Sequence, residues 1–479
     1  MSKEHPFDRY APVTDVAELK RMSDLPLRKS KRVNTLKSSV SDFQVWAATK
    51  QWTLTPVPWC NEAFYVDREN RDEALGKDLL HVLGHTYMQE AASMLPVALL
   101  DPQPGESILD MSSAPGSKTT QIAAKLQNKG VVVANDVQEK RMWALASNLQ
   151  RAGVMNVLVT KKVGQWFAGN MTERFDRVLC DAPCTAQGTA RKDSDALIYC
   201  SDDNIGKMAR LQLELLESAI HATKVGGRIV YSTCTLTPEE NESVLGSILN
   251  KFSDQIRIID PTPGLGFDLS KALEESKRVQ GWIQSKQPFP AFRLWPQTYD
   301  TEGFFAAVLE KRAPTRHAQQ DAGQWPKLDV LPPARRKEWV DNASDWYGAP
   351  LVEENELLFA KQENLHVITE EALHFRLPIL PYIAGLPFGK QTEHGLARLS
   401  HEMATLRGNR ARENILHLND EQRKHALSGR DIPYDNPGHG DLLLSIDHPA
   451  GKPLLLGRGM LMKGRILNRL PREIVRMFS

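Results

Sequence analysis

Cysteine and long apolar runs are scarce in this chain of 479 residues, and its net charge is only +1. No uninterrupted apolar run approaches the roughly 20 residues that a helix needs to cross a bilayer, so membrane insertion is not expected. The first eight residues, Met-Ser-Lys-Glu-His-Pro-Phe-Asp, include acidic side chains and no apolar stretch, which argues against a signal peptide. We therefore expect a cytoplasmic protein without membrane partners.

The five cysteines are too few for a disulfide framework, and their odd number would leave one unpaired. Reduced thiols are therefore expected. Zinc is a poor alternative, because Cys180 and Cys184 are followed by no second closely spaced pair of Cys or His. The sequence predicts no metal site.

A balanced charge argues against a nucleic-acid partner, because phosphate binding depends on Lys and Arg. The basic residues, however, are unevenly distributed. One basic run without acids lies between positions 27 and 40, and a second lies between 452 and 476 with Glu473 as its one acid. An isolated basic run is more often a solvated face than a binding site. Only the fold can decide whether the two runs share a surface.

The segment from Gly105 to Lys311 alternates short apolar runs with longer amphipathic ones, which predicts a doubly wound α/β domain. Strands are expected at 106–111, 131–135, 156–160, 175–180, 227–233, 256–259 and 304–309. Helices are expected at 118–126, 139–152 and 205–223, and a further helix is expected to open with a capping box from Thr237 to Glu240.

The flanking segments differ in composition from this core. Residues 1–104 are expected to be mostly helical, with a strand-rich part around 52–66, and residues 313–336 are typical of a linker. Beyond the linker, short apolar pieces separated by Gly, Pro and Asn suggest a small α+β module. We thus expect four segments: an N-terminal region (1–104), a core (105–312), a linker (313–336) and a C-terminal module (337–479).

The segment Asp110-Met-Ser-Ser-Ala-Pro-Gly-Ser-Lys118 lies where a strand passes into a helix, which is where α/β sheets bind ligands. It matches neither the phosphate-binding P-loop nor the dinucleotide motif Gly-x-Gly-x-x-Gly, so a ligand without a pyrophosphate is favoured. Asp136 follows the next strand and is placed to bind a ribose diol. S-adenosylmethionine, which has a ribose and an adenine but no phosphate, fits this pattern.

Two cysteines follow two further strands of the predicted sheet. Cys184 ends the segment Asp181-Ala-Pro-Cys, and Cys234 lies in Ser232-Thr-Cys-Thr. A lone cysteine at a strand end is more often a small buried apolar residue. Two of them at the ligand-binding edge instead favour nucleophilic catalysis, because a thiol is partly ionised at neutral pH and intrinsically nucleophilic.

These three motifs, in this order and all at strand ends, resemble the Nop/Sun family of RNA cytosine-5 methyltransferases. The segments Arg32-Val-Asn-Thr-Leu-Lys37, Tyr87-Met-Gln-Glu-Ala-Ala-Ser-Met-Leu-Pro96 and Arg191-Lys-Asp193, with the basic C-terminal run, are most similar to bacterial members that act on small-subunit 16S ribosomal RNA. The resemblance covers nearly the whole chain. It implies a Rossmann-like class I methyltransferase core, an N-terminal α+β extension and a C-terminal PUA-like RNA-binding module.

The resemblance also implies a mechanism. Cys234 matches the family's nucleophile, which adds to carbon 6 of cytosine. Cys184 matches the family's second cysteine, which assists elimination. Asp181 and Lys118 match residues that lie beside the reacting base. A base inside a helix cannot be reached, so the target must be unpaired or flipped out. The positions matching the S-adenosylmethionine site are Ser112, Ser113, Ala114, Pro115, Gly116, Ser117, Lys118, Asp136 and Asp181.

Two positions depart from the family pattern. Val163 stands where relatives carry an Asp that reaches the adenine amino group, and Gln187 stands where relatives often carry Glu. For RNA contact the basic runs point to Arg28, Lys31, Arg32, Lys37, Arg458, Lys463 and Arg465. The main hypothesis is a monomeric enzyme acting on ribosomal RNA within the small subunit. The alternatives are a transfer-RNA cytosine-5 methyltransferase and a non-catalytic ribosome-assembly factor.

Overall fold

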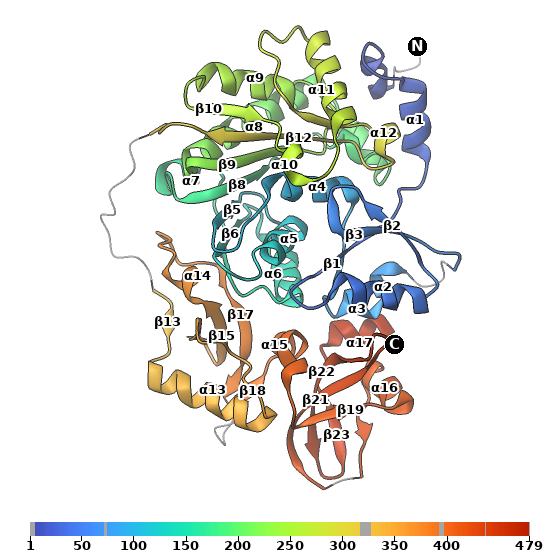
Figure 1. Ribbon diagram of the computed structural model, residues 1–479, viewed down its shortest axis with the longest axis vertical. Helices are drawn as coiled ribbons and strands as arrows, with labels where there is room; N and C mark the ends of the chain where they lie inside the picture. The colour runs from blue at the N-terminus through green and yellow to red at the C-terminus, as the bar shows by residue number, and fades with distance from the viewer. Residues whose placement is uncertain (1–4, 71–73, 317–326, 392–396, 436, 479) are drawn as a thin grey trace.

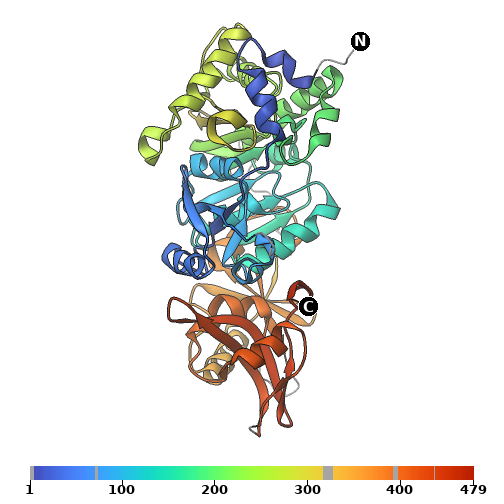
Figure 2. The ribbon, with the colours of Figure 1, turned by 90° about the vertical axis from the view of Figure 1, so that its right-hand side faces the viewer.

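The computed structural model describes residues 5–70, 74–316, 327–391, 397–435 and 437–478. It is elongated, with a large α/β core at one end and the strands β13 to β15 and β17 to β23 of the C-terminal part at the other (Figure 1). Turning the molecule by 90° shows the same separation, so the C-terminal residues lie below the core rather than around it (Figure 2).

A nine-stranded sheet forms the core, in the order β10-β12-β9-β8-β5-β6-β7-β16, with β11 paired to β12. Strands β5 to β9 are parallel, whereas β10, β11, β12 and β16 run antiparallel to their neighbours. The bounds are β5 Ser107–Asp110, β6 Val131–Asn135, β7 Val157–Thr160, β8 Phe175–Asp181, β9 Thr223–Thr233, β10 Ile256–Ile259, β11 Phe292–Leu294, β12 Phe304–Lys311 and β16 Ile383–Ala384. The predicted doubly wound α/β core is confirmed.

Apolar residues cover both faces of the sheet. Along β6, Val132 and Ala134 belong to one buried cluster and Val131 and Val133 to another, as the two-residue period of a strand requires. Helices α4 (Ala91–Leu100), α5 (Ser117–Lys125) and α6 (Glu139–Ala152) pack on the first face. Helices α7 (Trp166–Asn170), α8 (Asp202–Ala222) and α9 (Glu242–Lys251) pack on the second. The remaining core helices are α10 Thr262–Leu265, α11 Ser270–Trp282 and α12 Pro296–Tyr299, with 3-10 turns η3 Gln187–Thr189 and η4 Ser194–Tyr199.

The N-terminal region is α+β. Its four-stranded sheet has the order β2-β3-β1-β4. The bounds are η1 Pro6–Tyr10, α1 Val16–Asp24, β1 Ser30–Val33, α2 Val40–Thr49, β2 Thr53–Val57, β3 Cys60–Asp67, η2 Leu75–Lys77, α3 Leu79–Val82 and β4 Thr86–Met88. Its first helices pack on Leu236, Val279 and Trp295 of the core, so this region and the core share a buried cluster.

Two five-stranded sheets make up the C-terminal part, in the orders β13-β14-β15-β17-β18 and β19-β21-β22-β23-β20. The strands are β13 Asp329–Val330, β14 Glu356–Lys361, β15 Asn364–Thr369, β17 Leu386–Gln391, β18 Ala397–Leu399, β19 Ile415–His417, β20 Ile432–Pro433, β21 His439–His448, β22 Lys452–Met462 and β23 Arg465–Asn468. The helices are α13 Pro333–Tyr347, α14 Glu370–His374, α15 His401–Arg407, η5 Gly408–Arg410, α16 Asp420–Leu427 and α17 Arg472–Phe478.

The C-terminal part is joined to the rest of the chain at two places. Strand β16 extends the core sheet by pairing with β7. The second C-terminal sheet shares a buried cluster with α2, α3 and the N-terminal sheet. Part of the predicted linker, residues 317–326, lies outside the described residues, while β13 and the start of α13 fall within the same predicted stretch.

The capping box predicted from Thr237 to Glu240 is wrong. Helix α9 begins only at Glu242, and the Glu240 side chain is fully buried rather than at a helix N-terminus. A Thr and a Glu three residues apart match the spacing of the motif. The Glu240 carboxylate, however, accepts hydrogen bonds from buried groups of distant segments, which the sequence pattern cannot reveal.

Candidate active site

A cavity of about 470 Å³ opens at the carboxyl ends of β5 to β8. Its walls come from the loops that follow β5 to β9, from the first turn of α6 and from α8. Because the carboxyl ends of parallel strands meet at one edge, segments far apart in the chain converge here. The cavity is lined by Met111, Ser112, Ala114, Asn135, Asp136, Val137, Gln138, Arg141, Lys162, Val163, Gly164, Gln165, Asp181, Ala182, Pro183, Cys184, Leu211, Leu215 and Cys234.

The loop after β5 turns sharply into α5. Ser112 and Ala114 face the cavity, whereas Ser113 is buried and its hydroxyl donates to the carbonyl of Asp110 at 2.9 Å. The turn continues through Pro115 to Gly116, which has φ +106°. A side chain at Gly116 would meet Leu145 of α6 at 3.2 Å, so glycine is needed here for both its backbone and its lack of Cβ.

Asp136 and its neighbour Asn135 hold the cavity walls in place. The Asp136 carboxylate accepts the backbone N–H of Ala114 at 3.1 Å and that of Gln138 at 2.9 Å. The Asn135 amide donates to the carbonyls of Met111 and Lys162, at 3.1 and 2.9 Å. Asn135 thus ties together the loops after β5 and β7, a role that the sequence reasoning missed because nothing in the spacing of the chain marks it.

Val163 lies in the cavity wall with 55% of its surface exposed, as does Val137 on the opposite loop. The cavity wall is therefore apolar at the position where the resemblance implied an Asp. Gln187, the second departure, is buried, and its side-chain oxygen accepts the hydroxyl of Tyr10. It thus anchors the N-terminal turn η1 to the loop beyond Cys184.

The two cysteines face each other at the cavity, with their sulfur atoms 3.3 Å apart. The hydrogen bond to Cys234, together with burial, raises the pKa of Cys184 well above its ordinary value. Cys184 therefore keeps its proton and offers it to the Cys234 sulfur.

Lys118 and Asp181 form an ion pair beside the cysteines, with Nζ 2.7 Å from Oδ2. The other carboxylate oxygen accepts the hydroxyl of Ser232 at 2.7 Å. Burial alone would lower the pKa of Lys118, but the Asp181 carboxylate more than offsets this and raises it. Lys118 is therefore a permanent cation. Behind the pair, burial raises the pKa of Asp110 to about 7.

Glu240 connects the loops that carry the two cysteines. Its carboxylate accepts the backbone N–H of Thr185 at 3.0 Å and the Thr185 hydroxyl, and it accepts the Thr237 hydroxyl at 2.8 Å. Gln212 of α8 donates to it at 2.8 Å, and the Thr235 hydroxyl lies at 3.3 Å. Thr185 follows Cys184 and Thr235 follows Cys234. Glu240 therefore fixes the separation of the two sulfurs without touching either.

A buried ion pair stabilises the loop that contains Cys234. Arg293 of β11 and Glu242 of α9 are both fully buried and make two charge-assisted hydrogen bonds, at 3.0 and 2.5 Å. Arg293 also donates to the carbonyl of Leu236 at 2.7 Å. The strand β11 and helix α9 thus hold the loop two residues beyond Cys234.

The structure corrects part of the predicted RNA contact set. Lys31 is fully buried in an ion pair with Asp78, and Arg32 is 2% exposed and donates to Gln89 and Thr120. Neither side chain is available to a ligand at the surface. Both side chains connect the N-terminal sheet to neighbouring segments. A run of basic residues in a sequence does not show whether its members are buried in this way or exposed to solvent.

The other basic residues lie in different settings. Arg28 stacks on Tyr65 and pairs with Asp67, and Arg458 pairs with Asp441. The Lys37 side chain is partly exposed, but its ammonium group is buried and donates to the Leu83 carbonyl at 3.0 Å and to the Thr405 hydroxyl at 2.9 Å. Lys463 and Arg465 are exposed at the turn between β22 and β23. Of the predicted set, these last two are the most open to solvent.

Within the described residues, no helix combines the length and apolarity needed to span a bilayer. The same part of the chain gathers no group of three or more His, Cys, Asp or Glu side chains suited to a metal ion.

This chain is similar to known protein families and to individual proteins over most of its length. Residues 97–310 match the family model of the 16S rRNA methyltransferase RsmB/F, and residues 12–91 match that of the N-terminal domain of 16S rRNA methyltransferase RsmF. Ribosomal RNA small subunit methyltransferase F of Aliivibrio fischeri is 36% identical over 94% of this chain and 92% of its own. The protein of the same name from Vibrio cholerae is 36% identical over 97% and 94%.

The chain belongs to the 16S rRNA methyltransferase RsmB/F family. It is an S-adenosylmethionine-dependent methyltransferase of ribosomal RNA. The crystal structure of a methyltransferase homologue from Pyrococcus horikoshii is similar, with a TM-score of 0.53 and 35% identity, and covers 64% of this chain and 94% of the other. The family membership and Rossmann-like fold expected from the three motifs are thereby confirmed.

Proposed function

We propose that this enzyme methylates carbon 5 of a cytosine in 16S ribosomal RNA through a covalent bond between Cys234 and carbon 6. The observation that carries the proposal is the pair of sulfur atoms 3.3 Å apart at the cavity, with the Lys118–Asp181 ion pair beside them. A transfer-RNA substrate is less well supported, because the relatives are named for the small ribosomal subunit.

The residues present fit S-adenosylmethionine. The cavity offers apolar walls at Val137 and Val163 for an adenine, and the Asp136 carboxylate beside them for a ribose. The Asp181 carboxylate, which is paired with Lys118, lies on the side nearest the cysteines, where the sulfonium group would lie. When bound, the cofactor supplies a methyl group on a positively charged sulfur. We assign its binding to Ser112–Lys118, Asp136 and Asp181.

Carbon 5 of cytosine becomes nucleophilic only after a group adds at carbon 6. The Cys234 thiolate forms the bond to carbon 6, and the electron pair of the carbon 5–carbon 6 double bond becomes available at carbon 5 for the methyl group. The ring edge carries an acceptor at nitrogen 3 and a donor at the 4-amino group. Lys118 and Asp181 together provide one donor and one acceptor, which complements this edge and stabilises charge developing on it.

Elimination then restores the aromatic base. The proton on carbon 5 must leave, its electron pair re-forms the double bond, and the carbon 6–sulfur bond returns its pair to Cys234. We assign assistance with this step to Cys184, because its sulfur contacts that of the nucleophile. Exposed Lys463 and Arg465 suit contact with the RNA backbone, which positions a substrate without reading its sequence. We further propose a cytoplasmic monomer with a PUA-like C-terminal module.

Covalent trapping on 16S ribosomal RNA tests the proposal. The Cys184→Ala variant is expected to accumulate an RNA–protein adduct that resists denaturing electrophoresis, because addition still occurs while elimination is slowed. Cys234→Ala should give neither adduct nor methylated product, and Cys200→Ala serves as the matched control. Methylation by the Cys234 variant would refute the role assignment. Saturable cofactor binding without turnover on any RNA would instead favour a non-catalytic assembly factor.

A further inference from the structure

Trp143 is unusually exposed. It lies on α6, whose buried stripe consists of Met142, Leu145 and Leu149, and 75% of its own surface is accessible to solvent. A large aromatic side chain on the polar face of a helix contributes nothing to that stripe. A single exposed aromatic side chain is ordinary on a protein surface, so its meaning depends on what surrounds it.

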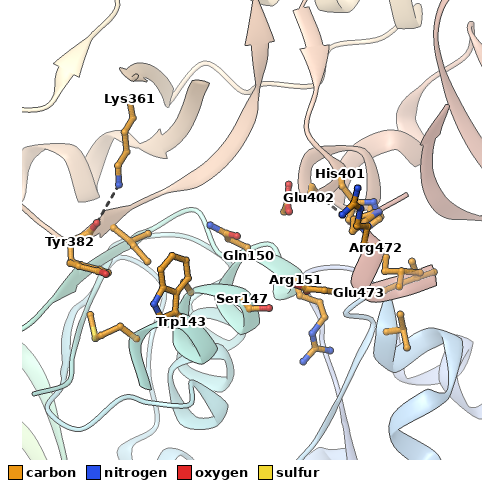
Figure 3. Close-up of a pocket in the computed structure, with 18 residues that line it drawn as sticks. Trp143, Ser147, Gln150, Arg151, Lys361, Tyr382, His401, Glu402, Arg472 and Glu473 are labelled. Atoms are coloured by element: carbon orange, nitrogen blue, oxygen red, sulfur yellow. Dashed lines mark hydrogen bonds between the residues drawn. The ribbon is translucent and has the colours of Figure 1, made fainter. Parts of the chain in front are cut away.

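The indole lies at a cavity of about 700 Å³ between the core and the C-terminal part. Figure 3 shows Trp143, Ser147, Gln150 and Arg151 along α6, with Lys361, His401 and Glu402 across an open space and Tyr382 to the side of Trp143. Arg472 and Glu473 at the start of α17 complete the wall. The volume falls within the range of pockets that hold small organic ligands.

The lining suits a nucleotide. Trp143 supplies a flat aromatic face, and Tyr382, which is 41% exposed, lines the same cavity. Lys361 and Arg472 are exposed cations at the wall, so they can pair with phosphate. Exposed aromatic faces beside basic side chains are how proteins bind single-stranded nucleic acid, because every base can stack and every nucleotide carries a phosphate.

The cavity also lies beside the cofactor site. The N–H of Tyr382 donates to the carbonyl of Val159 at 2.7 Å, which places Tyr382 at the carboxyl end of β7. The loop that follows β7 continues to Val163 in the wall of the cofactor cavity. On α6, Arg141 lines the cofactor cavity and Trp143 lines this one. Both cavities therefore border the carboxyl edge of the core sheet, where the target base must enter.

We propose that this cavity binds one unpaired nucleotide of the substrate RNA outside the target cytosine, with its base stacked on Trp143. The inference rests on the proposed function for its choice of RNA as the ligand. The RNA strand would run from the catalytic cysteines past the start of α6 to this cavity between the core and the C-terminal part. Affinity for the RNA would then depend on a side chain that touches neither the cofactor nor the reacting base.

Filter binding of a 16S ribosomal RNA transcript to the full-length enzyme tests this site. Trp143→Ala is expected to weaken binding by roughly 5- to 150-fold, the range that loss of one base–aromatic stack produces. Trp143→Phe should retain most of the affinity because a stacking face remains. Trp282→Ala is the matched control, since Trp282 is also partly exposed but lies on α11 in the opposite part of the molecule (Figure 1). Cofactor affinity and melting temperature should be unchanged in all three variants.

Photocrosslinking identifies the contact directly. A transcript containing 4-thiouridine is expected to crosslink to the peptide containing Trp143 or Tyr382 in the wild-type enzyme. Wild-type affinity of Trp143→Ala for the transcript would overturn the inference. A loss of affinity of Trp143→Ala for protein-containing small subunits but not for the transcript would also overturn the inference, because the cavity would then bind a protein. Binding is measured without turnover, so a wild-type enzyme that binds but never forms 5-methylcytosine would refute the proposed function alone.

Discussion

Replacing Glu240 by Gln separates the positioning of the cysteines from the stability of the fold. The buried carboxylate accepts hydrogen bonds from one backbone N–H, one amide and the threonine hydroxyls of both cysteine loops. In the Gln variant, the remaining oxygen can still accept from Thr185 N–H and Gln212, while its NH₂ group meets hydroxyls that can rotate to accept. The bonds persist but lose their charge.

The energetic cost follows from these partners. Hydrogen bonds to a charged group contribute about 1.5–3 kcal/mol and neutral ones about 1, so each bond weakens by about 0.5–2 kcal/mol in Glu240→Gln. Removing the buried charge also removes its desolvation cost, so we expect the free energy of unfolding to fall by only about 1–3 kcal/mol in total. Glu240→Ala leaves the Thr185 N–H and one of the two Gln212 amide hydrogens without an acceptor, at about 1–3 kcal/mol each, while the other Gln212 hydrogen still bonds the Pro183 carbonyl. The Gln variant should therefore remain folded at assay temperature, which makes its kinetics interpretable.

The kinetic effect should fall on the chemical step. Because Thr185 and Thr235 follow the two cysteines, loosening their shared acceptor lets the sulfurs move apart, and a displacement near 1 Å can cost about 100-fold in rate. We expect kcat to fall by roughly 10- to 100-fold. The KM for S-adenosylmethionine should change little, since Glu240 lies outside the cofactor cavity.

Single-turnover methylation of 16S ribosomal RNA measures this effect, with urea denaturation of the same samples. Glu239→Gln is the matched control, because Glu239 is the adjacent residue and pairs with Arg9 at the surface. A folded Glu240→Gln enzyme with wild-type kcat would refute the positioning role and leave Glu240 a residue of structural importance alone.

Three further predictions concern buried charge and backbone geometry. Burial lowers the pKa of Lys37 to about 7, below its unfolded value, so the unfolded chain binds this proton more tightly above pH 7. The free energy of unfolding should therefore rise by up to about 1.4 kcal/mol per pH unit between pH 7 and 10, and urea titrations should show a flatter rise for Lys37→Met; identical slopes would contradict this. Arg293→Met leaves Glu242 buried without a counter-ion and should cost about 3–5 kcal/mol in the same assay, whereas a loss below about 1 kcal/mol would mean that the pair is dispensable. Gly116→Ala introduces a Cβ at a residue with φ +106°, and this Cβ would lie 3.2 Å from Leu145. We expect calorimetry to show a higher Kd for S-adenosylmethionine, with the affinity for RNA unchanged. An unchanged cofactor Kd would argue against the need for glycine at this position.

Local patterns in the sequence were sufficient for the core. The strand at Val131–Asn135 and the helix at Glu139–Ala152, closed by Gly153 in the left-handed conformation, coincide with the prediction. These elements are determined by apolar periodicity and by a glycine at a helix end, both of which act over a few residues. The motifs around Asp110, Cys184 and Cys234 were likewise recognisable because each directly follows a strand, and parallel strands bring such ends to one edge.

The long-range partners of polar residues were decided by the tertiary structure alone. Lys31 and Arg32 belong to a basic run, yet one is buried against Asp78 and the other against Gln89, 47 and 57 residues away in the chain. Glu240 matches a capping motif but binds Thr185, 55 residues distant. A charged side chain in the sequence carries no sign of whether it faces water or a buried partner, because that depends on how separate segments pack. The chain by itself therefore determined the sheet, the family and the cysteines, while packing determined which charges hold them in place and where Trp143 meets the C-terminal part.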